Sequence, residues 1–120
     1  MQMLVVDDDL DVQDMMAACL RTNGHTVLVA DDAADALAEV ERHGMPDAVV
    51  LNVAMPGTDG ITLLHQLRQR VPNLPALFIT GFWNSADHIR VSSGSVGCLS
   101  KPFTCADMFQ AVRELSATAS

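Results

Sequence analysis

The sequence predicts an α/β fold, a doubly wound sheet of five parallel strands with helices on both of its faces. Five short apolar segments alternate with segments whose apolar residues recur at helical spacing. This alternation favours parallel strand pairing through right-handed crossovers. Polar residues end or follow these apolar segments, as expected where an α/β fold places its chemistry. With 120 residues, of which 49% are hydrophobic, the chain is long enough for one domain with its own core.

The predicted strands are rich in Val, Leu and Ile and end at turn-forming or charged residues. They cover residues 3–6, 25–30, 48–52, 76–80 and 97–100. The third strand has no polar residue before Asn52, which is typical of a strand buried on both faces. A loop must follow it, because Pro56 has a fixed φ and Gly57 accepts positive φ.

Helical periodicity fills the segments between these strands. Five helices are expected. Two are marked by apolar residues at helical spacing, from position 12 to 20 and from 108 to 115. The other three are expected over 33–43, over 61–71 and from 84 or 85 to about 92. The candidate N-caps are Asp9 or Asp11, Asp31 or Asp32, Asn84 or Ser85, and Thr104. The small, polar residues after 115 predict a frayed end, so we expect a domain at 1–116 and a tail or linker start at 117–120.

The net charge of −8 argues against nucleic-acid binding by this domain alone and against an anionic membrane surface. No stretch approaches the roughly 20 apolar residues that a membrane span needs. The run at residues 3–6 is too short for a secretory leader. The three cysteines lack metal-ligand spacing, so reduced thiols in a cytoplasmic protein are expected.

Polar side chains follow four strands, and in a parallel sheet these strand ends share one edge. Asp7 and Asp8 follow the first strand, Asn52 and Thr80 end the third and fourth, and Lys101 follows the fifth. Carboxylates hold Mg²⁺ through hard oxygen ligands. Lysine, threonine and backbone N–H groups neutralise phosphoryl oxygens, so the combination suits phosphate handling.

The motifs VVDDD, LNVAMPGTDG, FITG and LSKPF occur in this order. With them the chain closely resembles the receiver domain of two-component response regulators, over residues 3–115. The resemblance implies a flavodoxin-like fold with strand order 2-1-3-4-5. It also implies a signalling module of a phosphorelay, not an enzyme.

The resemblance assigns roles to the residues at the predicted edge. Asp8 would contact Mg²⁺ directly, Asp7 mostly through water, and the backbone carbonyl of Ala54 would be a third ligand. Thr80 would be the switch hydroxyl, and Lys101 would pair with the phosphoryl group.

Two positions depart from the family pattern. Asn52 stands where the family has its phospho-acceptor Asp, and an amide nitrogen is no nucleophile. The Mg²⁺ site, with Asn52 among its ligands, loses one negative charge and is weakened. Cys98 stands where the family usually has the Tyr or Phe that moves with the switch hydroxyl.

Three explanations of Asn52 are open. The preferred one is a native Asn in a module whose state is set without aspartyl phosphate. The second is an engineered block of an ordinary phosphorylatable receiver, which leaves Cys98 as a coincidence. The third is a native Asn beside another acceptor, such as Asp8 or Asp59.

Phe82 and Trp83 lie in the loop after the fourth strand. One reading is that a ring packs under the fourth helix; the other is an aromatic lid or an anchor for a partner. The resemblance implies a sensor histidine kinase or another signalling protein as partner. A homodimer through the fourth helix, fifth strand and fifth helix is a further option.

A remote rival is a haloacid-dehalogenase-like phosphatase, which also places DxD, a hydroxyl residue and Lys at one sheet edge. Against it, Asp11 stands where Thr or Val is expected. A flavodoxin-like cofactor binder needs a Gly- and hydroxyl-rich phosphate loop after the first strand, where this chain has three aspartates.

Overall fold

Five parallel strands form one sheet in the centre of a three-layer fold. The strands are β1 (Gln2–Val6), β2 (Thr26–Ala30), β3 (Ala48–Asn52), β4 (Ala76–Thr80) and β5 (Val96–Ser100). Their order is β2-β1-β3-β4-β5, so the predicted topology is confirmed. This structure is a computed structural model that describes residues 1–53, 60–80, 96–100 and 103–119, with backbone alone at 80, 96 and 116–119.

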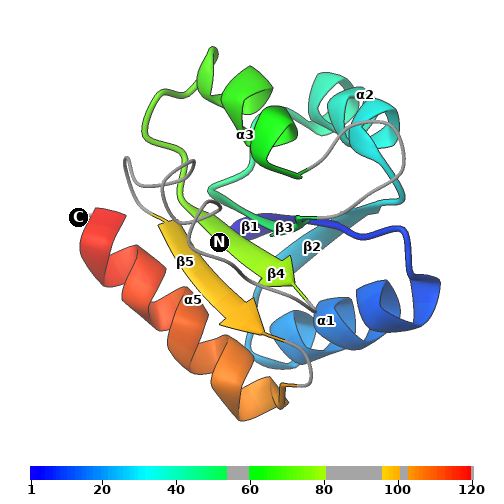
Figure 1. Cartoon of the computed structure of the whole chain (residues 1–120). Helices are drawn as coiled ribbons and strands as arrows, with labels where there is room; N and C mark the ends of the chain where they lie inside the picture. The colour runs from blue at the N-terminus through cyan, green and yellow to red at the C-terminus, as the bar shows by residue number, and fades with distance from the viewer. Residues whose placement is uncertain (54–59, 81–95, 101–102, 120) are drawn as a thin grey trace.

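Helices cover both faces of the sheet (Figure 1). The described helices are α1 (Leu10–Thr22), α2 (Ala33–His43), α3 (Gly60–Arg68) and α5 (Cys105–Ala119). Helices α1 and α5 pack on one face, and α2 and α3 pack on the other. The helix expected from 84 or 85 to about 92 lies outside the described residues. None of the described helices is long and apolar enough to cross a membrane.

Three of these helices have a side-chain N-cap, and each capping residue is one of the candidates predicted from the sequence. Asp9 caps α1 by accepting hydrogen bonds from the amides of residues 11 and 12, and Asp32 caps α2 by accepting from the amide of residue 35. Thr104 Oγ1 accepts from the amide of Asp107, whose carboxylate in turn accepts from the amide of Thr104. This reciprocal pair satisfies two backbone donors at the start of α5.

Two helix ends differ from the prediction. Helix α3 ends at Arg68 instead of residue 71, because the Leu67 carbonyl accepts from the amides of residues 70 and 71 in a turn that leads to Pro72. Helix α5 continues to Ala119, past the expected frayed end. Its alanines favour helix, and extending an anchored helix needs no new nucleus. The division of the domain at residue 116 stays a prediction.

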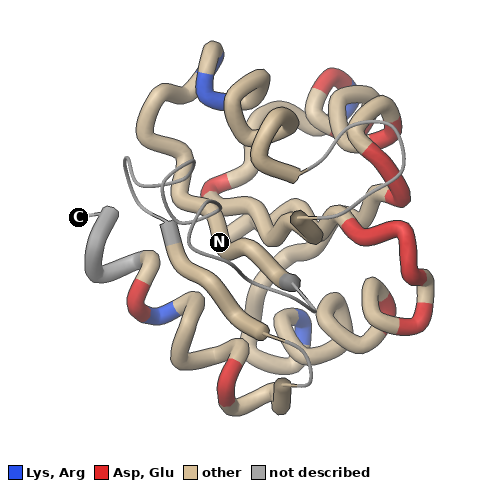
Figure 2. Tube along the Cα trace, viewed as in Figure 1, with Lys and Arg blue, Asp and Glu red and all other residues tan. Residues whose placement is uncertain are grey.

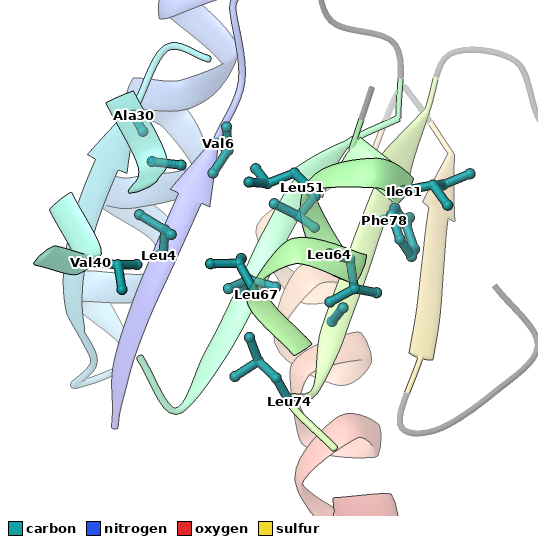
Figure 3. Packing of buried hydrophobic residues seen from close by; sticks show 14 residues of the cluster. Leu4, Val6, Ala30, Val40, Leu51, Ile61, Leu64, Leu67, Leu74 and Phe78 are labelled. Atoms are coloured by element: carbon teal, nitrogen blue, oxygen red, sulfur yellow. The ribbon is translucent and has the colours of Figure 1, made fainter. Parts of the chain in front are cut away.

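Side chains of the strands pack into two hydrophobic cores, one on each face of the sheet. Val49 and Leu51 of β3 join the cluster under α2 and α3, part of which Figure 3 shows. Ala48 and Val50 join the cluster under α1 and α5. All residues of β3 are buried, so the prediction of a strand buried on both faces is confirmed.

The expectation of reduced thiols is wrong for two of the three cysteines. Cys19 of α1 and Cys105 of α5 form a disulfide, with their Cα atoms 5.6 Å apart. They are separated by 86 residues and meet because α1 and α5 pack side by side on the sheet. Cys98, exposed on β5, is not part of this disulfide.

The start of α3 packs directly against the end of β3. The amide of Gly60 donates to the carbonyl oxygen of Val53 at 3.0 Å. A Cβ atom at Gly60 would overlap the backbone carbonyl oxygen of Asn52 and lie 3.3 Å from the Cβ atom of Leu51. Glycine is therefore required here for close approach to the end of β3.

We expect Gly60→Ala to lower the free energy of unfolding by about 1–3 kcal/mol, because the added methyl group displaces the end of β3. Urea denaturation measures the change. His65→Ala, at an exposed position of the same helix, is the control and should change stability by less than about 0.5 kcal/mol. Equal stability of the two variants would contradict the close packing at Gly60.

Candidate functional site

Three polar side chains meet where β1 and β3, which are neighbours in the sheet, end. Asp7 follows β1 and is fully buried, and Asn52 is the last residue of β3 and is also buried. Asp8 is exposed beside them. The structure therefore brings together these three of the predicted site residues, and we refer to Asp7, Asp8 and Asn52 as the acidic site.

The Asn52 amide lies between the two carboxylates. Its nitrogen, Nδ2, donates to Asp7 Oδ1 at 3.2 Å and to Asp8 Oδ1 at 3.1 Å. An amide nitrogen carries two hydrogens, so each carboxylate receives one. The amide is turned this way because its oxygen would otherwise face two anionic oxygens.

Backbone donors add to the stabilisation of the buried Asp7 carboxylate. Asp7 Oδ1 also accepts from the amide of Asp9 at 2.9 Å. Asp9 in turn caps α1 with its own side chain, so the loop from β1 to α1 is held by successive side chain-to-backbone bonds. Burying a carboxylate is costly unless it is hydrogen-bonded, and these donors reduce that cost.

Gln13 supports the acidic site from α1, and sequence reasoning missed it. It is buried, and its Nε2 lies 3.2 Å from the carbonyl oxygen of Asp7 and 2.9 Å from that of Ala30. The same nitrogen lies 3.0 Å from Asp31 Oδ1. Gln13 thus joins the ends of β1 and β2. The signal was available, since position 13 falls on the buried stripe of α1 with Met16, Ala17 and Leu20.

For the other predicted site residues, the structure describes only some of the positions. Thr80 ends β4 and pairs with Ser100 at the end of β5, so its backbone lies at the same edge of the sheet. Cys98 is an exposed residue of β5. The predictions for Ala54, Asp59, Phe82, Trp83 and Lys101 lie outside the described residues. The roles of these side chains stay predictions.

The surroundings of the acidic site are strongly negative. Aspartates gather where β1 leads to α1 and where β2 leads to α2 (Figure 2). They are Asp7, Asp8, Asp9, Asp11, Asp31, Asp32 and Asp35. Such a field attracts cations and basic groups of a partner, and it repels an unaccompanied phosphate.

The acidic site could bind a hard cation such as Mg²⁺ only if the Asn52 amide turned its oxygen toward the carboxylates. In the described part of the chain, no three His, Cys, Asp or Glu residues gather as a metal-binding group. Two carboxylates are present, and Asn52 directs its nitrogen, which is no metal ligand, toward both. Turning the amide would present its oxygen, which Mg²⁺ accepts, but would break both hydrogen bonds.

We expect Gln13→Ala to lower the free energy of unfolding by about 1–3 kcal/mol, since it removes the side-chain donor to the Asp7 carbonyl and one of the two donors to the Ala30 carbonyl. Gln110→Ala, an exposed glutamine on α5, is the matched control and should be near neutral. Thermal unfolding followed by circular dichroism measures both. A neutral Gln13→Ala would contradict the bridging role.

Comparisons with known proteins agree with this architecture. The family model of the response regulator receiver domain matches residues 3–113. The response regulator MprA of Mycobacterium leprae is 35% identical over 116 residues, which are 96% of this chain and 50% of the relative. The probable transcriptional regulatory protein TcrX of Mycobacterium tuberculosis is 34% identical over 93% of this chain and 48% of its own. The chain thus spans about half the length of these curated relatives.

Solved structures give the same result. A putative response regulator from Chloroflexus aurantiacus has a TM-score of 0.85 at 32% identity, covering 97% of both chains. The receiver domain of NtrX from Brucella abortus has a TM-score of 0.82 at 32% identity, covering 95% of this chain and 98% of that one. The chemotaxis protein CheY4 of Vibrio cholerae has a TM-score of 0.88 at 24% identity, covering 95% of this chain and 97% of that one, and shows the CheY-like fold alone. By fold and by family match, this chain belongs to the response regulator receiver domains of two-component signalling.

Proposed function

We propose that this chain is a receiver module that acts through protein interactions, not as an enzyme, and that aspartyl phosphate does not set its state. The proposal depends on Asn52, which ends β3 beside Asp7 and Asp8 and stands where the family has its acceptor. Forming aspartyl phosphate needs a carboxylate oxygen to attack phosphorus. The lone pair of the amide nitrogen is delocalised into its carbonyl, so Asn52 supplies no such nucleophile.

The observation that carries the proposal is the pair of hydrogen bonds from Asn52 to the two carboxylates. An acceptor Asp at this position would add a third negative charge, and the three carboxylates would repel one another unless a cation lay between them. The neutral amide removes one charge and provides two donors. We infer that Asn52 keeps the acidic site assembled without a metal.

Receiver domains generally bind Mg²⁺ at the acidic pocket. In this chain Asp7, Asp8, the amide oxygen of Asn52 and the backbone carbonyl of Ala54 would hold the ion. When bound, Mg²⁺ neutralises the carboxylates and the phosphoryl oxygens. We propose that binding is weak here, because it competes with both hydrogen bonds of Asn52.

The remaining assignments are proposals that the resemblance to the family supports. Thr80 is the proposed switch hydroxyl and Lys101 the proposed phosphoryl contact, while Cys98 supplies no aromatic ring for switching. The proposed partner is a sensor histidine kinase or another signalling protein in the cytoplasm. The negative field around the acidic site supports a partner with basic groups and argues against nucleic acid and anionic membranes.

Two surfaces are proposed for contacts with proteins. One is the segment with Phe82 and Trp83, where Trp suits an interface anchor. The other is the homodimer face that the fourth helix expected from the sequence would form with β5 and α5. A stability loss in Trp83→Ala without a loss of partner binding would assign that ring to packing instead.

We expect Asn52→Asp to make stability depend on Mg²⁺. Without metal the variant should lose roughly 3 kcal/mol, because it places an uncompensated charge beside Asp7 and Asp8. Mg²⁺ at about 100 times the Kd of the variant should raise the Tm of the variant by about 5 °C or more, and the same concentration should raise that of the wild type by about 1 °C or less.

Asn73→Asp, which adds the same charge at an exposed turn, is the matched control and should respond to Mg²⁺ no more than the wild type does. Differential scanning fluorimetry in EDTA and in Mg²⁺ gives the comparison. A wild-type Tm that rises with Mg²⁺ as much as that of Asn52→Asp would contradict the proposed weak site.

We expect the wild type to incorporate no phosphate from acetyl phosphate and Mg²⁺, because position 52 has no nucleophile. Asn52→Asp should become phosphorylated, since it restores the attacking carboxylate. Phos-tag electrophoresis and intact mass measure both. A stable phosphoprotein of the wild type would instead identify another acceptor, such as Asp8 or Asp59.

A further inference from the structure

We propose that Cys19 and Cys105 form a reversible redox site, whose disulfide cross-links α1 to α5 under oxidising conditions and opens to two thiols under reducing conditions. This inference goes beyond the proposed function and does not depend on Asn52. It begins from the disulfide between the two helices, which closes a loop of 86 residues.

The folded chain itself brings the two cysteines together. Cys19 lies in the third turn of α1, and Cys105 is the first residue of α5. The two helices already share one core, to which Met16, Met108 and Val112 belong. Because this packing does not require the bond, reduction leaves the helices in place and the thiols adjacent. The bond can therefore open and close without refolding.

The disulfide is accessible from one side. Cys105 is exposed, whereas Cys19 is 95% buried, having only 5% of its surface exposed. A cavity of about 350 Å³ between α1 and α5 is lined by Met15, Ala18, Cys19, Thr22, Cys105 and Phe109. The Met15 sulfur lies 3.9 Å from Cys19 Sγ. A small thiol or disulfide can enter this cavity and reach the exposed sulfur, which a buried structural bond would not permit.

The chemistry is thiol–disulfide exchange with a small organic disulfide such as oxidised glutathione. The Cys105 thiolate attacks one glutathione sulfur, forms a mixed disulfide and releases one glutathione thiolate. The Cys19 thiolate then attacks Cys105 Sγ and releases the second. In the net reaction, two protein thiols become one disulfide, and two electrons and two protons pass to form two reduced glutathione molecules.

The linkage acts on the helix that supports the acidic site. Helix α1 begins at Leu10, directly after the capping residue Asp9, and carries Gln13, which donates to the Asp7 carbonyl. Oxidation ties this same helix covalently to α5. The redox site therefore determines whether the helix that supports the acidic site is covalently tied to α5.

The test uses the purified full chain in buffers of varied reduced-to-oxidised glutathione ratio, quenched by alkylation and read by peptide mass mapping. We expect a Cys19–Cys105 peptide pair in excess oxidised glutathione and two alkylated cysteines in excess reduced glutathione. Cys98 should be alkylated in excess reduced glutathione and should carry at most a glutathione adduct in excess oxidised glutathione. A Cys19–Cys105 disulfide that persists in excess reduced glutathione, one that never forms, or a disulfide of Cys98 with either of these cysteines would overturn the proposal.

Thermal unfolding gives a second readout. Oxidised wild type should melt roughly 10 °C or more above reduced wild type, because the cross-link restricts the unfolded chain. Cys98→Ser, the matched control, should show the same difference, and Cys105→Ser should show none. Cys105 is exposed, so its substitution leaves the core intact. An equal oxidation shift in Cys105→Ser would place the redox chemistry elsewhere and refute the proposal.

Discussion

The hydrogen bonds from Asn52 to Asp7 and Asp8 are the interaction on which the rest of the site depends. A parallel sheet brings strand ends to one edge, and here it brings carboxylates to that edge. Asp7 is fully buried, so its charge must find donors within the protein. The Asn52 amide supplies one donor to each carboxylate, and it does so with no charge of its own.

This arrangement separates assembly of the site from its chemistry. We propose that a carboxylate at position 52 would react with phosphorus but would need a cation to lie stably beside Asp7 and Asp8. The amide holds the same three residues together and is inert as a nucleophile. The sheet, the cap of α1 and the support from Gln13 hold the residues of the acidic site in place around this amide.

Helix α1 links the acidic site to the opposite end of the chain. Its cap, Asp9, donates its amide to the Asp7 carboxylate, and Gln13 on its buried stripe contacts the ends of β1 and β2. Two turns further on, Cys19 joins α5 through the disulfide. The same rigid helix therefore supports the site at its start and contacts α5 near its end.

Local sequence determined the elements, because hydrophobic period, caps and turn residues act over a few neighbouring residues. The sequence also placed Asn52 at the end of the third strand, where the resemblance to the family leads one to expect Asp. The order of the motifs indicated the family, and the family implied the strand order. Tertiary structure alone decided which side chains touch. The direction of the Asn52 amide, the bridging by Gln13 and the pairing of Cys19 with Cys105 depend on helices and strands far apart in sequence. Such contacts are set by packing across the sheet, and no local pattern encodes them.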